Sequence, residues 1–292
     1  MIDGELLMRK QNKSFIYENR SNLILLAIVV VLALILSAKT FEYLQQVTIV
    51  TPKTALRSGP GIEYSSKSTL KKEQRVTIIR RKYHWIYIKD ASNKLGWIAD
   101  WNVAKKYRNK ISSVSDATIV IDPGHGGADS GALSTTGKME KTYTLKVARK
   151  VIAKLRAKGA KVYMTRDSNK YVGLAARAEL SNKVHADAFI SFHFDSSPVA
   201  NDASGVTTYY YHQKLSYRLA KTINSEFNTL SLDNRGIDVG NFQVIRDNEF
   251  PAILLEMGYI NSDRDFAQIK SNSYQNTISS DVVTSLTKYF EN

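Results

Sequence analysis

Two histidines and two glutamates stand at points of the sequence where buried strands end or a helix begins. His125 lies in a Pro- and Gly-rich loop after an apolar run, and His193 ends a second apolar run. Glu140 opens a stretch of helical periodicity, where it could also be an ordinary acid at a helix N-terminus. Glu256 closes a buried run, and a carboxylate there is costly unless it is paired, bound to a metal or catalytic.

This set of residue types is suited to zinc-assisted hydrolysis. Two His and one carboxylate form a known catalytic zinc set, in which the pKa of the zinc's water falls to about 7. A second carboxylate can take the proton of that water and pass it to a leaving amine. The chain contains no Cys, so any metal must be held by His, Asp or Glu. Spacing alone does not say which carboxylate has which role.

The elements around these residues alternate between strands and helices. This order predicts an α/β fold with a central, mostly parallel sheet flanked by helices. Loops at the carboxyl ends of such strands are where ligands bind, which suits the two histidines. We expect strands over 119–121, 161–166, 188–193, 205–211, 242–246 and 252–256, and helices over 140–158, 174–184, 215–227 and 276–289.

A smaller β-rich module precedes this region. Short alternating strands with turns run from Val47 to Val103, which favours a small barrel. Its aromatic residues Tyr83, Trp85 and Trp101 fit the core of such a barrel. Residues 105–115 are basic and lack apolar periodicity, which is typical of a linker.

The N-terminal part contains one long apolar run. Residues 23–36 are uninterrupted apolar residues, and with their flanks they approach the roughly 20 residues needed to cross a bilayer. A cleavable signal peptide is the alternative, since Ser37 and Ala38 are small. We favour an uncleaved transmembrane helix over 22–41, because the preceding tail is long and no A-x-A site follows.

Charge indicates the orientation and the surroundings. Arg9, Lys10, Lys13 and Arg20 precede the span and only Lys39 closely follows it, which predicts a cytoplasmic N-terminus. The net charge of +14 points to an anionic environment such as nucleic acid, membrane lipid or cell wall. Export of the larger part favours the wall and argues against a nucleic-acid partner.

Several motifs resemble known bacterial families. DPGHGG, GKMEKTYTL, TR, SFHFDSS, RG and LLEMGYI are similar, in order and spacing, to the zinc-dependent N-acetylmuramoyl-L-alanine amidases over residues 118–290. LRSGPG and GWIADWNV resemble the bacterial SH3-like domain of cell-wall proteins, although Lys72-Glu73-Gln74 stands where that family usually has Gly. The second resemblance implies wall binding or a spacer role.

The amidase resemblance assigns roles residue by residue. It implies that His125, Glu140 and His193 bind Zn²⁺ and that Glu256 is the catalytic acid/base. The implied reaction hydrolyses the amide between N-acetylmuramic acid and L-alanine of the peptidoglycan stem peptide. Asp195 replaces the family's usual Asn and is a candidate substrate contact. Apart from the resemblance, Arg235 and Arg246 are candidates to hold stem-peptide carboxylates, because Arg matches the geometry of a carboxylate, and the alternative for both is a surface or sheet-edge role. His84, His185 and His212 match no ligand position, and we interpret them as structural or solvated.

These inferences together predict a membrane-anchored wall hydrolase. The expected parts are a cytoplasmic tail (1–21), a transmembrane helix (22–41), an SH3-like wall-associated domain (42–106), a linker (107–117) and an extracellular zinc amidase domain (118–292). The short loop 195–204 leaves no room for the autoinhibitory helix of some division amidases. We therefore hypothesise control by tethering to the cell membrane and by a membrane-protein activator.

Two other functions fit part of the pattern. The SH3-like and amidase-like domains could form a receptor that binds peptidoglycan without cutting it, although suitable residues at all four site positions argue against this. A zinc peptidase acting within the stem peptide would use the same ligand set, and only the family resemblance disfavours it. The products of digestion distinguish these functions.

Overall fold

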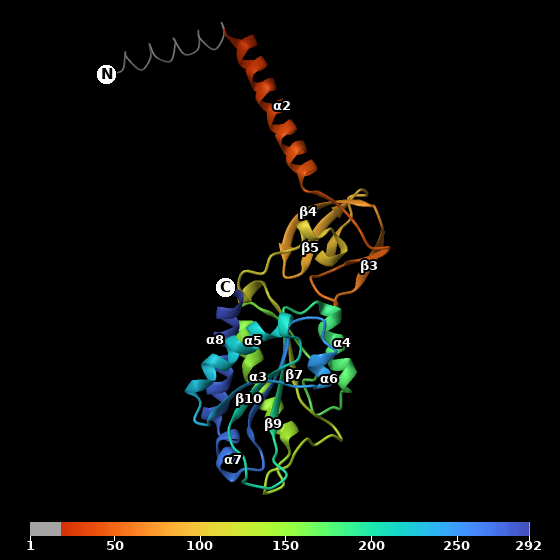
Figure 1. Cartoon of the computed structure of the whole chain (residues 1–292). Coiled ribbons are helices and arrows are strands. Elements are labelled where there is room, and N and C mark those ends of the chain that lie inside the picture. Colours follow the sequence, from red (N-terminus) through yellow and green to blue (C-terminus); the bar gives the residue numbers. More distant parts are fainter. Residues whose placement is uncertain (1–18, 292) are drawn as a thin grey trace, which may run out of the picture.

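The structure is a computed structural model that describes residues 19–291. It comprises a long N-terminal helix, a small β-domain and a larger α/β domain, arranged in that order along one direction (Figure 1). Most of the expected tail, including Arg9, Lys10 and Lys13, lies outside the described residues.

Helix α2 (Arg20–Leu44) contains the apolar run and has no buried residue. Its 25 residues correspond to about 37 Å of helix, longer than the roughly 30 Å of a bilayer's hydrocarbon core. By length and composition it is a candidate membrane span. The helix continues through Ser37 and Ala38 without a break.

The small domain is a six-stranded antiparallel sheet in the order β1-β4-β5-β6-β2-β3. Alternate apolar residues of its strands point inward and form one core with Ile49, Ile86 and Ile98 fully buried. This confirms the expected SH3-like β-domain. The strands are β1 (Gln46–Thr48), β2 (Lys53–Arg57), β3 (Ser66–Lys71), β4 (Arg75–Lys82), β5 (Trp85–Asp90) and β6 (Leu95–Ala99).

The larger domain contains a second six-stranded sheet, in the order β11-β10-β12-β9-β7-β8. Every neighbouring pair is parallel except β10 and β12. The expected mostly parallel sheet is thus confirmed. Its strands are β7 (Thr118–Pro123), β8 (Lys161–Met164), β9 (Ala188–Asp195), β10 (Val206–Tyr210), β11 (Asn234–Val239) and β12 (Ala252–Tyr259).

Helices cover both faces of this sheet, as the fold class requires (Figure 1). Helices α3 (Glu140–Ala157), α5 (Gln213–Glu226) and α8 (Asn272–Glu291) share one apolar core with the sheet. Helices α4 (Leu174–Val184) and α6 (Gln243–Arg246) pack in a second cluster on the other face. Helix α7 (Asp263–Ile269) contacts β12 and α8.

Two expectations for single elements were wrong. The segment 242–246 is not a strand but contains the short helix α6, in which the N–H groups of Ile245 and Arg246 both donate to the carbonyl of Phe242 within one turn. Strand β11 was not expected, because this edge strand is polar and largely exposed. Strand β11 pairs with β10 at this edge of the sheet.

The small domain docks on the amino ends of the larger sheet's strands. His84 lies between two carboxylates: its Nδ1 is 3.3 Å from Asp100 Oδ2 of the small domain, and its Nε2 is 2.9 Å from Asp187 Oδ1 of the larger domain. Asp187 Oδ2 also accepts a hydrogen bond from the N–H of Thr118, where β7 begins. The Trp101 ring stacks on that of His185, with centroids 3.9 Å apart.

This contact explains two of the aromatic residues singled out above. Trp85 is buried in a second apolar cluster of the small domain, and Tyr83 and Trp101 pack against that cluster. Tyr83 and Trp101 also reach the larger domain, where the Tyr83 hydroxyl donates to the carbonyl of Gly159 and the Trp101 ring stacks on His185. The segment expected to be a linker is also packed, since Ile111 contacts the core of the larger domain. The two domains are joined by specific side-chain contacts as well as by the chain.

We expect the His84 bridge to stabilise the protein up to alkaline pH. Burial alone would lower its pKa, but hydrogen bonds and charge from Asp100 and Asp187 raise the pKa of His84 to about 10 from 6.5. Because the pKa of His84 is higher in the folded than in the unfolded protein, its protonation stabilises the folded state. This stabilisation is complete below pH 6.5, the pKa in the unfolded chain, and is lost as the pH rises through about 10. His84→Gln should therefore cost about 1.5–3 kcal/mol near pH 7.

Thermal unfolding of the full chain in detergent measures this effect. The midpoint of His84→Gln should lie well below that of the wild type at pH 7, and the gap should shrink above pH 10. His212→Gln is the control, because the Nε2 of His212 bonds to the backbone carbonyl of Arg246 and not to a carboxylate of the contact between the domains. A gap that does not narrow with pH would contradict a charged His84.

Candidate metal centre and active site

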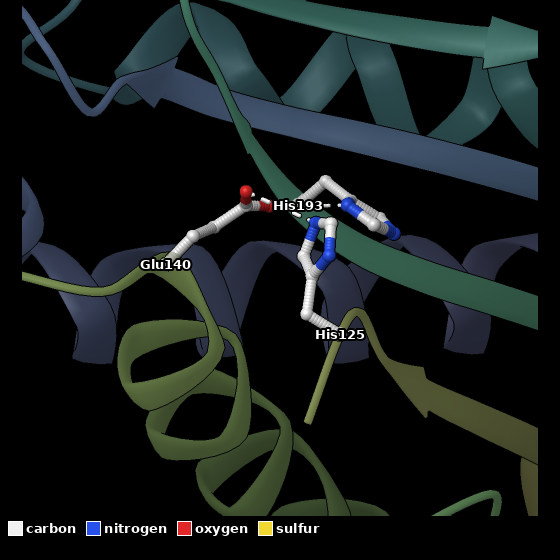
Figure 2. Close-up of side chains that lie close together, drawn as sticks. All are labelled: His125, Glu140 and His193. Atoms are coloured by element: carbon white, nitrogen blue, oxygen red, sulfur yellow. Dashed lines mark hydrogen bonds and ion pairs between the residues drawn. The ribbon is translucent and has the colours of Figure 1, made fainter. Parts of the chain in front are cut away.

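His125 is held in a strained loop directly after β7. Its φ of 60° lies in the left-handed region, and the φ values of Gly126 and Gly127 are also positive. For a residue other than Gly this conformation costs about 1–3 kcal/mol and is concentrated at functional sites. The loop turns the imidazole toward the start of α3 (Figure 2).

Two buried arginines hold this loop through hydrogen bonds to its backbone carbonyls. Arg166 donates to the carbonyl of Gly124 at 2.8 Å, and Arg177 donates to the carbonyl of His125 at 2.9 Å. Arg177 also forms a fully buried ion pair with Asp122 of β7, at 2.7 Å. Because a guanidinium offers five donors in a rigid plane, each Arg holds several loop carbonyls at once. These contacts give His125 a defined position.

Glu140, the first residue of α3, brings the two histidines together. His125 Nε2 is 3.0 Å from Glu140 Oε2, and His193 Nδ1 is 3.0 Å from Glu140 Oε1 (Figure 2). The ligand atoms of the three residues all lie within 4.8 Å of one another. The structure thus places the three expected metal ligands in one cluster, although they come from a loop, a helix and a strand.

The carboxylate of Glu140 is oriented by the backbone. It is 2% exposed, and its two oxygens accept from the N–H groups of Phe194 at 3.0 Å and Ala132 at 2.9 Å. Burial alone would raise its pKa, but the hydrogen bonds and charges of the two histidines hold it far below the usual range. A Cβ at Gly131 would lie 2.5 Å from Glu140 Oε2, so only Gly fits beside the carboxylate.

The donor set fits a zinc ion. Two imidazole nitrogens and one carboxylate oxygen are the protein ligands of a known class of catalytic zinc site. Burial is the largest single effect on the pKa of His125 and would lower it. The hydrogen bonds and charges of Glu140 and Asp129 together outweigh burial, so the pKa of His125 is raised. A divalent cation in place of the proton would satisfy the same negative groups.

Asp129 orients His125 and was missed in the sequence. Both of its carboxylate oxygens lie 2.9 Å from His125 Nδ1, which leaves Nε2 to face Glu140. Metal-binding histidines usually donate their other N–H to such a group, which sets the tautomer and the ring orientation. The sequence shows an Asp four residues after the loop His, but this spacing alone is weak evidence that the two side chains are in contact.

We expect Asp129→Asn to weaken zinc binding by about 10- to 100-fold while the protein stays folded. The neutral amide keeps the shape but removes the charge that favours the correct tautomer of His125. Competition with a zinc chelator of known affinity measures the dissociation constant. Asp202→Asn, in an exposed loop, is the control and should bind zinc as the wild type does. Equal affinities of the two variants would contradict the orienting role.

Glu256 lies beside the cluster on β12. In the parallel pairing of β12 with β9, Glu256 is the register partner of His193, so both side chains project on the same face. The residue is half-buried, but its Oε2 is fully enclosed and has no hydrogen-bond partner among the described residues. Burial and then the charges of Glu140 and Asp195 raise its pKa well above the usual value. An unpaired buried carboxyl oxygen next to a metal-type cluster is suited to proton transfer.

A cavity of about 310 Å³ opens beside the histidines and gives a ligand access. Its rim includes the exposed side chains of Tyr171, Leu174 and Phe242, which offer apolar contact to a substrate. The lining residues are His125, Asp129, Tyr171, Val172, Leu174, Arg177, His193, Phe242, Gln243, Val244 and Leu254.

The three expected substrate contacts differ in their positions. Asp195 ends β9 two residues after His193 and pairs in register with Tyr259. Arg235 is exposed, with its guanidinium 5.5 Å from the centre of the Tyr259 ring. Arg246 does not line the cavity and is engaged by Asp247 and Asn241, each at 3.0 Å. The structure therefore brings Asp195 and Arg235 near each other but not Arg246.

The remaining histidines lie outside the cluster, as expected. His84 and His185 are part of the contact between the domains, and His212 meets a backbone carbonyl. The sequence did not indicate that Arg166 and Arg177 are buried supports of the site, and only Arg166 was noted, as part of the TR motif. Their signal was weak because an arginine in sequence is normally read as a surface residue.

Fold and site together define a wall amidase of the α/β type. The profile of the family described as N-acetylmuramoyl-L-alanine amidase matches residues 119–288, and that of the bacterial SH3 domain matches residues 52–104. The chain belongs to the N-acetylmuramoyl-L-alanine amidase family, and its enzyme class is that of these amide hydrolases.

Curated relatives are similar over more than four fifths of the chain. The chain is 38% identical over 253 residues to the "Probable cell wall amidase LytH" of Staphylococcus epidermidis, covering 84% of each protein. It is 36% identical over 250 residues to LytH of Staphylococcus aureus, covering 82% of this chain and 83% of that protein. The similarity thus extends well beyond the larger domain.

Solved structures resemble the larger domain. The amidase AmiC2 of Nostoc punctiforme is 34% identical with a TM-score of 0.58, and the match covers 60% of this chain and 98% of AmiC2. The catalytic domain of CwlV from Bacillus (Paenibacillus) polymyxa is 33% identical with a TM-score of 0.57, covering 59% of this chain and 97% of CwlV. Both are described as N-acetylmuramoyl-L-alanine amidases.

Proposed function

We propose that this protein is a membrane-anchored zinc enzyme that hydrolyses the amide between N-acetylmuramic acid and L-alanine of peptidoglycan. The observation that carries the proposal is the convergence of His125, Glu140 and His193 beside the unpaired buried oxygen of Glu256. Membership of the amidase family identifies the bond. The same four residues would serve a peptidase, so the family and not the ligand set decides the substrate.

In this proposal His125, Glu140 and His193 hold the zinc ion, and Asp129 orients the first of them. When bound, zinc supplies a Lewis acid that polarises the scissile carbonyl and lowers the pKa of water toward 7. The open side of the cluster faces the cavity, so a substrate amide can approach without displacing the protein ligands.

Glu256 is the acid/base in this proposal. Its carboxylate takes a proton from the attacking water and delivers it to the nitrogen of L-alanine as the amide bond breaks. The enclosed position raises the pKa of Glu256 well above its usual value, so the carboxyl group holds the transferred proton more firmly until the leaving nitrogen takes it. No other described carboxylate combines burial, a free oxygen and this position beside His193.

Substrate contacts are assigned to the edge of the site near Tyr259. The exposed guanidinium of Arg235 is suited to a stem-peptide carboxylate, since Arg binds carboxylates through two parallel hydrogen bonds. Asp195 stands close to the reacting centre and would accept hydrogen bonds from substrate N–H or O–H groups. Arg246 would have to release Asp247 and Asn241 before it could bind substrate.

The proposed location is the outer face of a bacterial cell membrane, with α2 as the anchor and the N-terminus in the cytoplasm. The contacts through His84 and Trp101 support a spacer role for the small domain, because they join it rigidly to the amino ends of the strands. The site lies at the carboxyl ends and thus faces away from the membrane. Wall binding by the small domain remains part of the proposal.

We propose that two factors control the hydrolase activity: tethering of the enzyme to the membrane and a membrane-protein activator. Residues 196–205 contain turns but no helix, so this loop supplies no blocking element. Turnover on membrane-presented peptidoglycan should be lower for a soluble fragment of residues 42–292 than for the full chain. Equal turnover of the two proteins would refute control by tethering.

Mass spectrometry of digested peptidoglycan tests the reaction itself. The purified full chain with zinc should release intact stem peptides with new L-alanine amino termini and leave the glycan uncut. Cleavage between stem-peptide residues would instead indicate the peptidase. Binding to peptidoglycan without any products, even with membranes added, would favour the receptor.

A further inference from the structure

The junction between α2 and the small domain is short and well defined. Helix α2 ends at Leu44 and β1 begins at Gln46, so a single residue separates them. The carbonyl of Gln45 accepts from the N–H of Ile78 at 3.0 Å, and Glu42 forms an ion pair with Lys89 of β5. The domain is therefore held directly against the end of the helix (Figure 1).

The end of α2 has the composition of a membrane–water interface. Phe41 and Tyr43 are 65% and 66% exposed, and they stand beside Lys39 and Glu42, the first charges after the apolar run. Aromatic rings of this kind mark the headgroup level of a bilayer. If α2 spans a membrane, β1 and the start of β4 lie at the depth of the lipid phosphates.

A cavity of about 310 Å³ lies at this junction. Arg75, the register partner of Thr48, contributes the charged group, and Tyr43 and Tyr107 contribute hydroxyls. The remaining lining residues are Leu44, Gln46 and Val47. The cavity thus combines a cation, several hydrogen-bond donors and an apolar side toward the helix.

The charge of Arg75 is not neutralised by the protein. Within residues 19–291 its exposed side chain has no ion pair or hydrogen bond. Glu42 is already engaged by Lys39 and Lys89, and the exposed Glu73 makes no ion pair with Arg75. Residues 46–107 carry 13 Lys and Arg against 4 Asp and Glu, so the surrounding domain also attracts anions.

We propose that this cavity binds the phosphodiester headgroup of an anionic phospholipid, with the Arg75 guanidinium as the principal phosphate contact. Arg matches phosphate oxygens with two parallel hydrogen bonds, and the hydroxyls of Thr48, Tyr43 and Tyr107 are suited to the remaining oxygens. The apolar wall at Leu44 suits the start of an acyl chain. A membrane lipid is the favoured source because the cavity adjoins the membrane helix.

The bound lipid would fix the small domain against the bilayer surface. The rigid contact through His84 would then extend this orientation to the larger domain. This inference depends on the proposed membrane anchor but not on the amidase reaction. Sodium carbonate extraction tests the anchor separately: release of the wild type would refute the anchor, whatever the lipid result.

Native mass spectrometry of the full chain tests the lipid site. The protein is reconstituted in nanodiscs with equal phosphatidylcholine and phosphatidylglycerol, released into mild detergent, and its retained lipids are counted. We compare the wild type with Arg75→Gln and Lys82→Gln, which remove one positive charge from opposite ends of β4. The thermal unfolding midpoint of each variant in detergent checks that it is folded.

We expect the wild type and Lys82→Gln to retain phosphatidylglycerol in preference to phosphatidylcholine. Retention by Arg75→Gln should be about five- to tenfold lower, the effect of losing one cation that contacts the lipid surface. Equal retention by Arg75→Gln and Lys82→Gln, or no preference for the anionic lipid in the wild type, would overturn the proposal. Displacement of the lipid by a soluble glycerol-phosphate oligomer at similar concentration would assign the site to a wall polymer and also overturn it.

Discussion

Glu256→Gln is expected to lower kcat by about two to four orders of magnitude while zinc binding is unchanged. The amide has the shape of the carboxyl group but cannot take a proton from water or deliver one to the leaving amine. Its effect should fall on kcat rather than KM, because Glu256 acts on the proton and not on the remote parts of the substrate. Release of stem peptides from purified peptidoglycan gives the rate, and elemental analysis gives the zinc content.

A matched variant isolates the role of this carboxyl group. Glu249→Gln changes an exposed glutamate on the same segment that leads into β12, and it should keep wild-type activity. The raised pKa of Glu256 adds a second test, since the wild type should show a pH dependence that Glu256→Gln lacks. Activity of Glu256→Gln within tenfold of the wild type would exclude Glu256 as the acid/base.

His193→Ala is expected to abolish both stoichiometric zinc binding and measurable activity. The substitution removes one of three protein ligands, and it also leaves the buried Glu140 with only one of its two imidazole partners. Loss of one partner of a buried charge is strongly destabilising, so the variant should also unfold at a lower temperature. Zinc content after dialysis and the rate of stem-peptide release measure the two main effects.

Chelation provides the complementary experiment. Removing zinc from the wild type should abolish activity, and added Zn²⁺ should restore it, whereas His193→Ala should not recover at the same zinc concentration. His212→Ala is the matched control, because His212 lies outside the cluster, and it should retain both zinc and activity. Full activity of the chelated wild type would refute the zinc mechanism.

The two ends of β7 connect the halves of the molecule. At its amino end Thr118 donates to Asp187, which also contacts His84 of the small domain. At its carboxyl end the chain turns into the loop that carries His125. The strand is only six residues long and fully buried, so it transmits a fixed orientation from the docking contact to the site. A rigid spacer of this kind sets the direction in which the site faces.

Much of the fold followed from local patterns. The boundaries of α4 were predicted to the residue, and the alternation of strands and helices indicated the mostly parallel sheet. Periodicity fails where an element is short or lies at an edge, because few residues are then buried on a regular face. That is the reason for the error over 242–246 and for the omission of β11.

The sequence by itself determined the family, the order of the elements and the four residues proposed for chemistry, since motifs and periodicity are properties of adjacent positions. Only the tertiary structure decided that Glu256 and His193 are register partners and that Asp129 orients His125. It also decided that His84 joins the two domains. The pairing of Glu256 with His193 and the contact made by His84 depend on distances between segments far apart in the chain, which packing and burial set and no local pattern records. The contact between Asp129 and His125 spans only four residues, but it depends on the conformation of the loop, in which the φ of His125 is positive.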